Sequence, residues 1–347
     1  MVAAQPPRAW SITARLSPAD RLVLRLAFSA VMGFAIAIGL HWEFSFLAPM
    51  LAMQIVAAMP VCPDVRQGAA IPLVIFLATT AALAAATLFE DAPVALLAVV
   101  CLVLCWTFYG QKRGAPAIAM LLIQISFSAV PLFSSLSLDL AQSFAEFLQK
   151  SSVAAIATVW ISHAMFPAPA SMPSGPAPAP AGLAPGRAAQ VAITDTLVLL
   201  PLLAKFMIWS SIDDFVILMI TINLLREVDT LKTGKIAIAL LIGNVLGGVL
   251  AVVAQQFVLV ADTLIQFLLT IFLAGLLFGG RLARGGPMAP VFVLAFGTFI
   301  LLGIAITPLP GGSEEAFVVR IAKISAASLY ALAALGLVAR LRGQEER

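Results

Sequence analysis

The chain has 347 residues, of which 62% are hydrophobic and 11% are charged, and its formal net charge is +3. An ordinary soluble domain is about 45–50% apolar and about 25% charged, so the surplus of apolar side chains must face lipid. At about 20 residues per membrane-spanning helix, roughly a dozen spans fill the chain and leave little room for a soluble domain. We therefore expect an all-α, polytopic integral membrane protein.

The chain begins with a polar segment, 1–21, that carries Arg8, Arg15 and Arg21. A second apolar run follows the first almost at once, and no small-residue cleavage site separates them, so we expect an uncleaved first helix rather than a signal peptide. The apolar runs predict twelve transmembrane helices, six on each side of a break, at 22–41, 45–61, 68–89, 92–109, 115–135, 145–165, 189–209, 214–226, 234–258, 262–280, 287–308 and 317–340.

Proline and alanine dominate the break, which predicts an extended, semi-rigid connector rather than a helix. The predicted organisation is therefore a cytoplasmic N-terminal segment, a first six-helix repeat, a cytoplasmic linker, a second six-helix repeat and a cytoplasmic tail, at 1–21, 22–165, 166–188, 189–340 and 341–347.

The two groups of six helices carry similar landmarks at nearly constant separation. Trp42 closes the first helix of one group and Trp209 closes the first helix of the other, while Gly68 and Gly234 open the two third helices. Because each group has an even number of spans, both point the same way across the bilayer. We expect parallel repeats related by an axis along the membrane normal.

The placement of the 20 lysines and arginines predicts the orientation. With the N-terminus in the cytoplasm, most of them fall in cytoplasmic loops, whereas the acidic pairs Glu90–Asp91, Asp213–Asp214 and Glu314–Glu315 fall outside. Cytoplasmic loops are enriched in Lys and Arg, so we expect both termini in the cytoplasm.

The second helix of each repeat is unusually short, and the first of the two contains Pro49. Short or proline-interrupted spans at matching positions of two repeats often mark a binding site near the bilayer midplane. Each of these helices carries one amide, Gln54 or Asn223, which would contact a solute. The alternative is that both amides only hydrogen-bond neighbouring helices.

Ionisable residues inside spans are candidate functional groups because burying them in a membrane is costly. Asp195 lies near the cytoplasmic end of the seventh predicted helix and could accept a coupling proton. Lys205 lies about 15 Å further along that helix and could attract an anionic solute. Alternatively, Lys205 snorkels to the outer interface beside Trp209. Trp42 and Trp209 would flank the outer mouth of the pathway.

Asp213 and Asp214 open the eighth predicted helix, where they would cap its N-terminus or accept protons. The sequence contains no G-x-x-x-x-G-K-[ST] loop, no H-E-x-x-H and no G-x-S-x-G elbow, so we expect neither an enzyme nor a cofactor nor a metal. Cys101 and Cys105 share one helix face without a third ligand, which favours packing over metal binding. Nothing indicates a nucleic-acid partner.

The stretch from 24 to 60 and the basic loop after it resemble the opening of the fusaric acid resistance and aromatic acid exporter superfamily. The resemblance is carried by Arg25, Trp42, Pro49, Gln54 and Arg66. It covers 20–165 well and the second half more loosely, and it points to a compact branch known only as a domain of unknown function. Larger exporters of the superfamily carry soluble domains that have no counterpart in this chain.

The resemblance implies a proton-coupled exporter of aromatic carboxylic acids in the bacterial inner membrane. It also implies a periplasmic adaptor (membrane fusion) protein and an outer-membrane channel as partners. Two alternatives stay open: a passive anion channel, and a membrane scaffold that transports nothing. The sequence also leaves open whether the chain forms a homodimer.

Overall fold

The structure is a computed structural model of the whole chain, and its described residues lie in six segments and a few isolated positions. The segments are 16–59, 61–167, 182–208, 233–261, 263–286 and 288–303, and the isolated positions are 218, 221, 222, 225, 326, 329, 330, 333 and 336.

The described part of the chain is all α, which confirms that part of the predicted fold class. It contains ten helices: α1 (Pro18–Gly39), α2 (Leu47–Ala58), α3 (Val65–Leu88), α4 (Pro93–Lys112), α5 (Ala117–Ser134), α6 (Leu138–Met165), α7 (Pro185–Ile208), α9 (Thr233–Ala261), α10 (Leu264–Ala283) and α11 (Ala289–Gly303). The spans predicted at 214–226 and 317–340 lie almost wholly outside the described residues.

Six of the described helices, α1, α3, α4, α5, α7 and α10, are long and apolar enough to cross a membrane. Shorter apolar stretches occur in α2, α9 and α11. The protein is therefore a multi-pass membrane protein. A helix bonds its backbone N–H and C=O groups internally, so each of these long apolar segments can cross the hydrocarbon region without leaving polar backbone groups unsatisfied.

Local capping sets where several helices begin, and the capped starts lie earlier than hydropathy alone predicts. Ser17 and Asp20 form a reciprocal capping box at the start of α1. The Asp64 carboxylate accepts from the backbone N–H of Gln67 at the start of α3. The Ser137 hydroxyl accepts from the backbone N–H of Leu140, so α6 starts at Leu138 rather than at the predicted 145. Caps use polar residues, which a search for apolar runs discards.

The short helix α2 packs closely against α1. A Cβ at Gly33 would lie 2.7 Å from the Cα of Pro49, so only glycine allows the two backbones to approach this closely. The chain reverses between the helices through His41, which has a positive φ of 55°. Helix α2 also packs against α6 and α11, so it lies inside the helix assembly rather than on its surface.

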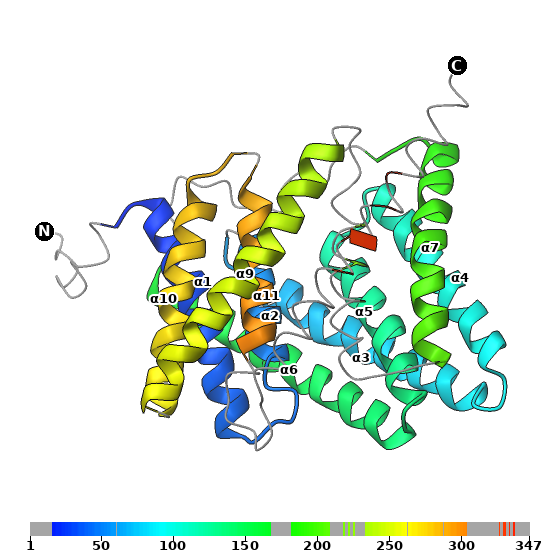
Figure 1. Cartoon of the computed structure of the whole chain (residues 1–347), viewed down its shortest axis with the longest axis horizontal. Coiled ribbons are helices and arrows are strands. Elements are labelled where there is room, and N and C mark those ends of the chain that lie inside the picture. Colours follow the sequence, from blue (N-terminus) through cyan, green and yellow to red (C-terminus); the bar gives the residue numbers. More distant parts are fainter. Residues whose placement is uncertain are drawn as a thin grey trace, which may run out of the picture.

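Several helices that are far apart in the sequence lie side by side (Figure 1). Helix α1 packs along α10, although they are far apart in the sequence, and α7 packs along α4 in the same way. Helix α3 packs on α5 and α6, and α9 packs on α11. A Cβ at Gly275 would come within 2.7 Å of Ala27, so the contact between α10 and α1 depends on a small residue.

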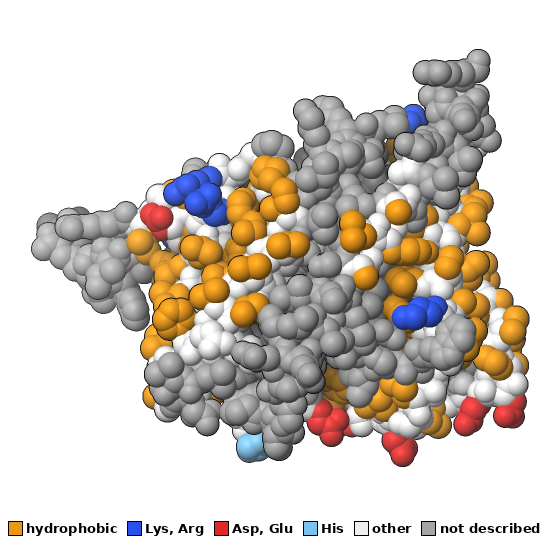
Figure 2. Space-filling model, viewed as in Figure 1, with side chains coloured by type: hydrophobic (Ala, Val, Ile, Leu, Met, Phe, Trp, Pro, Cys, Tyr) orange, Lys and Arg blue, Asp and Glu red, His pale blue; other side chains and the backbone are white. Residues whose placement is uncertain are grey.

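The surface of the assembly carries large apolar side chains in regular rows. Leu269, Leu273 and Leu277 follow one another at every fourth position along α10, and all are more than half exposed. Leu102 and Trp106 form the same kind of row on α4. Figure 2 shows hydrophobic side chains spread over much of the visible face. In water this surface would promote aggregation, whereas lipid is its natural solvent.

The contact between α9 and α11 depends on one of two adjacent glycines. A Cβ at Gly247 would collide with the carbonyl oxygen of Ala295, whereas a Cβ at Gly248 would meet only Leu302, at 3.6 Å. The buried Asn244 carboxamide oxygen accepts from the Thr298 hydroxyl at 2.7 Å in the same interface. The two backbones therefore approach closely at Gly247 but not at Gly248.

Gly247→Ala should destabilise the protein by about 1–3 kcal/mol because the new methyl group separates the two helices. Gly248→Ala is the matched control, and it should be neutral or stabilise the protein by up to about 1 kcal/mol because alanine favours a helix. Thermal unfolding of both purified variants in detergent measures the difference. Equal midpoints for the two variants would contradict the close approach of α9 and α11.

Candidate functional site

The strongest candidate site is a buried ion pair between α4 and α7. Lys112 Nζ lies 3.4 Å from Oδ2 of Asp195, and the two side chains are only 1% and 8% exposed. Charged groups are almost never buried to this extent unless they are paired. The prediction that Asp195 is a buried ionisable residue is consistent with this position, and the structure supplies a partner, Lys112, that the sequence did not indicate.

Lys112 reaches the pair because α4 is longer than hydropathy predicts. The apolar run ends at 109, but the helix continues to Lys112 and ends where Gly114 takes a positive φ of 89°. The additional turn keeps the lysine helical and places its side chain against α7. A cation in the last turn also interacts favourably with the C-terminal end of the helix dipole.

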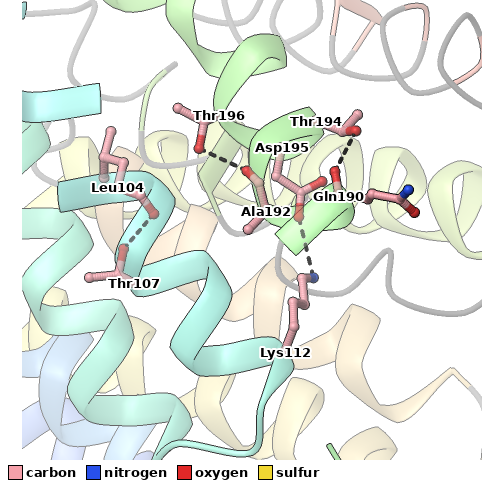
Figure 3. A network of polar contacts seen from close by, with 8 residues as sticks. All are labelled: Leu104, Thr107, Lys112, Gln190, Ala192, Thr194, Asp195 and Thr196. Atoms are coloured by element: carbon pink, nitrogen blue, oxygen red, sulfur yellow. Dashed lines mark hydrogen bonds and ion pairs between the residues drawn. The ribbon is translucent and has the colours of Figure 1, made fainter. Parts of the chain in front are cut away.

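The hydroxyl groups around the ion pair bond to their own helices (Figure 3). The Thr196 hydroxyl donates to the carbonyl oxygen of Ala192, and the Thr107 hydroxyl donates to that of Leu104, both at 2.8 Å. The hydroxyls of Thr107 and Thr196 therefore bond within α4 and α7 and not across the contact between the two helices. Since the surroundings offer little solvation, the attraction between Lys112 and Asp195 is strong compared with the same attraction in water.

The residues just before α7 are hydrogen-bonded to the C-terminal end of α4, next to this ion pair. The backbone N–H of Leu183 donates to the carbonyl oxygen of Lys112 at 2.9 Å, and Arg113 Nη1 donates to the carbonyl oxygen of Leu183 at 2.8 Å. A Cβ at Gly182 would lie 2.5 Å from the carbonyl oxygen of Arg113. Glycine at 182 thus allows the end of the linker to dock on α4 and positions the helix that carries Asp195.

The ion pair links the contact between α4 and α7 to the charge on Asp195. Protonation of Asp195 would remove its charge and leave the Lys112 ammonium buried without that counter-ion. A buried ion pair that loses one partner is strongly destabilised. Helices α4 and α7 would then favour a different relative position, or Lys112 would move toward another anion.

The structure places two of the predicted solute-contacting residues away from this pair. Gln54 lies half-buried in α2, next to Met53, whose Cε would lie 3.4 Å from a Cβ at Gly297 of α11. Trp42 lies half-buried after α1, with its ring centroid 6.4 Å from that of Phe147. Both residues lie in the N-terminal part of the chain, in or next to α1 and α2, and their contact with a solute stays a prediction.

Lys205 does not meet Asp195. Its side chain is exposed in the last turn of α7, and its Nζ lies 4.8 Å from the ring centroid of Phe206. The other predicted site residues, Trp209, Asp213, Asp214 and Asn223, lie outside the described residues.

Arg25, which carries part of the family resemblance but was not among the predicted site residues, is a second buried charge. Its side chain is 1% exposed in α1, and its Nε donates to the carbonyl oxygen of Arg21 at 3.2 Å. Cys62, in the segment between α2 and α3, lies close enough to interact electrostatically with it. Burial raises the pKa of the Cys62 thiol, and the Arg25 guanidinium opposes that rise.

Comparison with known proteins gives one match. A family model described as "Protein of unknown function (DUF2955)" matches residues 22–162, which run from α1 into the last turn of α6. The chain is similar to that family over this segment, in agreement with the predicted resemblance to a domain of unknown function. No curated protein and no solved structure matches the chain.

A double-mutant cycle tests the energetic role of the ion pair. Lys112→Met and Asp195→Leu should each lower stability by about 3–5 kcal/mol, because each leaves one charge buried without its partner. The double variant should lose much less than the sum, because no unpaired charge is left. Unfolding midpoints of the purified proteins in detergent measure the coupling.

The exposed pair Lys150–Glu146 of α6 is the matched control, with side chains 47% and 60% exposed. Lys150→Met and Glu146→Leu should change stability by about 1 kcal/mol or less and show little coupling. Additive losses in the Lys112–Asp195 cycle would contradict a functional interaction between those side chains.

Proposed function

We propose that the protein is a secondary transporter of small organic anions, coupled to protons, in the inner membrane of a bacterium. The observation that carries the proposal is the buried Lys112–Asp195 pair, which joins α4 and α7 within a multi-pass membrane protein. Ionisable residues buried among membrane helices commonly serve proton relays or substrate pathways.

The helix contacts support an arrangement of twelve helices in two parallel repeats. If the span predicted at 214–226 is counted, α7 is the first helix and α10 is the fourth helix of the second repeat. The first helix of each repeat then packs on the fourth helix of the other, as α1 on α10 and α7 on α4. The contact of α3 with α5 has its counterpart in that of α9 with α11. A two-fold axis along the membrane normal accounts for these reciprocal contacts.

In this arrangement the ion pair crosses the boundary between the repeats. Lys112 belongs to the first repeat and Asp195 to the second, so the protonation state of Asp195 acts directly on the contact between them. A ligand can shift a two-state equilibrium only by binding one state more tightly than the other. Here the proton would be that ligand, because it neutralises the Asp195 carboxylate and so removes the attraction to Lys112 only in the paired state.

Charge placement supports an orientation with both termini in the cytoplasm. Basic residues cluster where α1 begins and where α4 and α10 end. Glu90 and Asp91 lie between α3 and α4, at the end of α4 opposite to its basic residues. Figure 2 shows several acidic side chains along its lower edge. Under the positive-inside rule, the basic ends of the helices face the cytoplasm and Asp195 lies near that side.

The resemblance of the first repeat to the exporter superfamily supports an aromatic carboxylic acid as the solute and export as the direction. We propose Gln54, Asn223 and Lys205 as solute contacts, Trp42 and Trp209 as flanks of the outer mouth, and Asp213 and Asp214 as further proton acceptors. Export beyond the periplasm would require a periplasmic adaptor and an outer-membrane channel.

Everted membrane vesicles that contain the full chain test the proposal with radiolabelled benzoate as the aromatic carboxylate. The wild-type protein should accumulate benzoate only while a proton gradient is present. Asp195→Asn should reduce gradient-driven uptake by at least about tenfold, because the amide cannot carry the coupling proton. Glu146→Gln, which alters the exposed ion pair of α6, should leave uptake unchanged.

Other results would contradict parts of the proposal. Uptake that persists after the gradient is collapsed would remove proton coupling, and conductance in planar bilayers at rates beyond a carrier's turnover would indicate an anion channel. The absence of flux of benzoate and related aromatic acids in the wild-type protein would favour the scaffold alternative.

A further inference from the structure

Helix α5 is the most deeply buried of the helices that could span the membrane. Every residue from Leu121 to Phe133 except Ile123 is buried, and the share of buried residues in its apolar window is 67%, compared with 28–44% for the other five spans. It packs against α3, α4, α6 and α7. A polar side chain on this stretch is therefore surrounded by other helices and does not face lipid.

Three polar side chains nevertheless lie on this buried stretch, and they differ in their hydrogen bonding. The Ser126 hydroxyl donates to the carbonyl oxygen of Leu122 at 2.9 Å. Within the part of the chain that the structure describes, neither polar atom of the Gln124 amide nor the hydroxyl of Ser128 has a hydrogen-bond partner. Gln124 is 0% exposed and Ser128 is 1% exposed.

Gln124 and Ser128 share one face of α5, and that face points away from α6. They are four residues apart, so their side chains lie one above the other. Phe133 contacts α6 through the ring of Phe144, with the ring centroids 4.6 Å apart. At about 100° per residue, Gln124 lies roughly half a turn around the helix from Phe133, whereas Ser126 shares the face of Phe133. The two side chains without partners therefore form a cluster separate from the contact with α6.

Leaving these groups dry would be costly. An unsatisfied buried polar group costs about 1–3 kcal/mol, and a carboxamide and a hydroxyl together offer about three donor hydrogens and four acceptor lone pairs. A buried polar group without a protein partner commonly bonds to ordered water. In a membrane protein, polar groups of this kind are expected where a water-filled cavity reaches the helix interior.

We propose that the Gln124–Ser128 face of α5 lines a water-filled section of the solute pathway. Water satisfies both side chains between transport events, and their neutral donors and acceptors replace part of the hydration of a passing carboxylate. Neutral groups bind an anion less tightly than a fixed cation, which allows release. The assignment rests on the proposed transport function for the identity of the solute, but the access of water to this face is tested without any transport.

The test is cysteine labelling in membrane vesicles that contain the full chain. Cys62, Cys101 and Cys105 are first replaced by serine or alanine, and Ser128→Cys or Ser126→Cys is then introduced. The probe is 2-sulfonatoethyl methanethiosulfonate, an anionic reagent that modifies only thiolates in contact with water. Ser126→Cys is the matched control, because it has the same residue type, the same helix and nearly the same depth but faces α6.

Ser128→Cys should react at least about tenfold faster than Ser126→Cys, since only water-exposed thiols ionise and react. Equal rates, or no reaction of Ser128→Cys, would overturn the proposal. Benzoate transport plays no part in this readout, so a failure of the proposed function leaves the labelling result interpretable.

Thermal unfolding of Gln124→Leu provides a second, independent readout. If water is the partner of the amide, the apolar side chain expels that water, and the unfolding midpoint should stay the same or rise. If Gln124 instead has a structural protein partner, the midpoint falls, which would overturn the proposal even if labelling succeeded. The same substitution should reduce benzoate uptake where the wild-type protein transports it.

Discussion

The absence of water from the membrane interior is the constraint on which the structure depends. A backbone N–H or C=O group that cannot bond to water must bond within the chain, and a helix satisfies this requirement inside a single segment. The spans of this protein meet it with helices whose outer faces carry rows of leucine and other large apolar residues. In lipid the hydrophobic effect does not drive helices together, so their contact depends on close packing. Small residues such as Gly33, Gly247 and Gly275 allow this packing.

The polar and charged side chains that are buried among these apolar helices are the most informative about function. Lys112 and Asp195 satisfy each other across two helices that come from different parts of the chain. Gln124 and Ser128 have no described partner on the most buried of the long apolar helices. The first case suggests a charge whose pairing can be switched, and the second suggests a place for water. Both lie in or against the first six helices, although the acidic residues of the sequence point to the second half for the ion chemistry.

Local sequence patterns predicted the helices well but their ends less well. The apolar runs located each described helix, because burial in lipid selects for continuous hydrophobicity. The starts at Pro18, Val65 and Leu138 depend on the capping residues Ser17, Asp64 and Ser137, which are polar and therefore invisible to hydropathy. The end of α4 had a direct consequence for the site, since the last turn carries Lys112. The predicted span ended at 109, which left Lys112 in a loop and gave no reason to expect it beside Asp195.

The sequence by itself determined that the protein lives in a membrane, that it is all α and that a few polar residues are buried at a cost. These properties follow from composition and local pattern, because the choice between lipid and water acts on each segment separately. Only the tertiary structure decided which buried groups meet. Lys205 was the nearest lysine along the helix of Asp195, yet a helix holds the two about 15 Å apart. The reciprocal packing of α7 on α4 brought in Lys112 instead, and contacts of that kind depend on how distant segments pack rather than on any local signal.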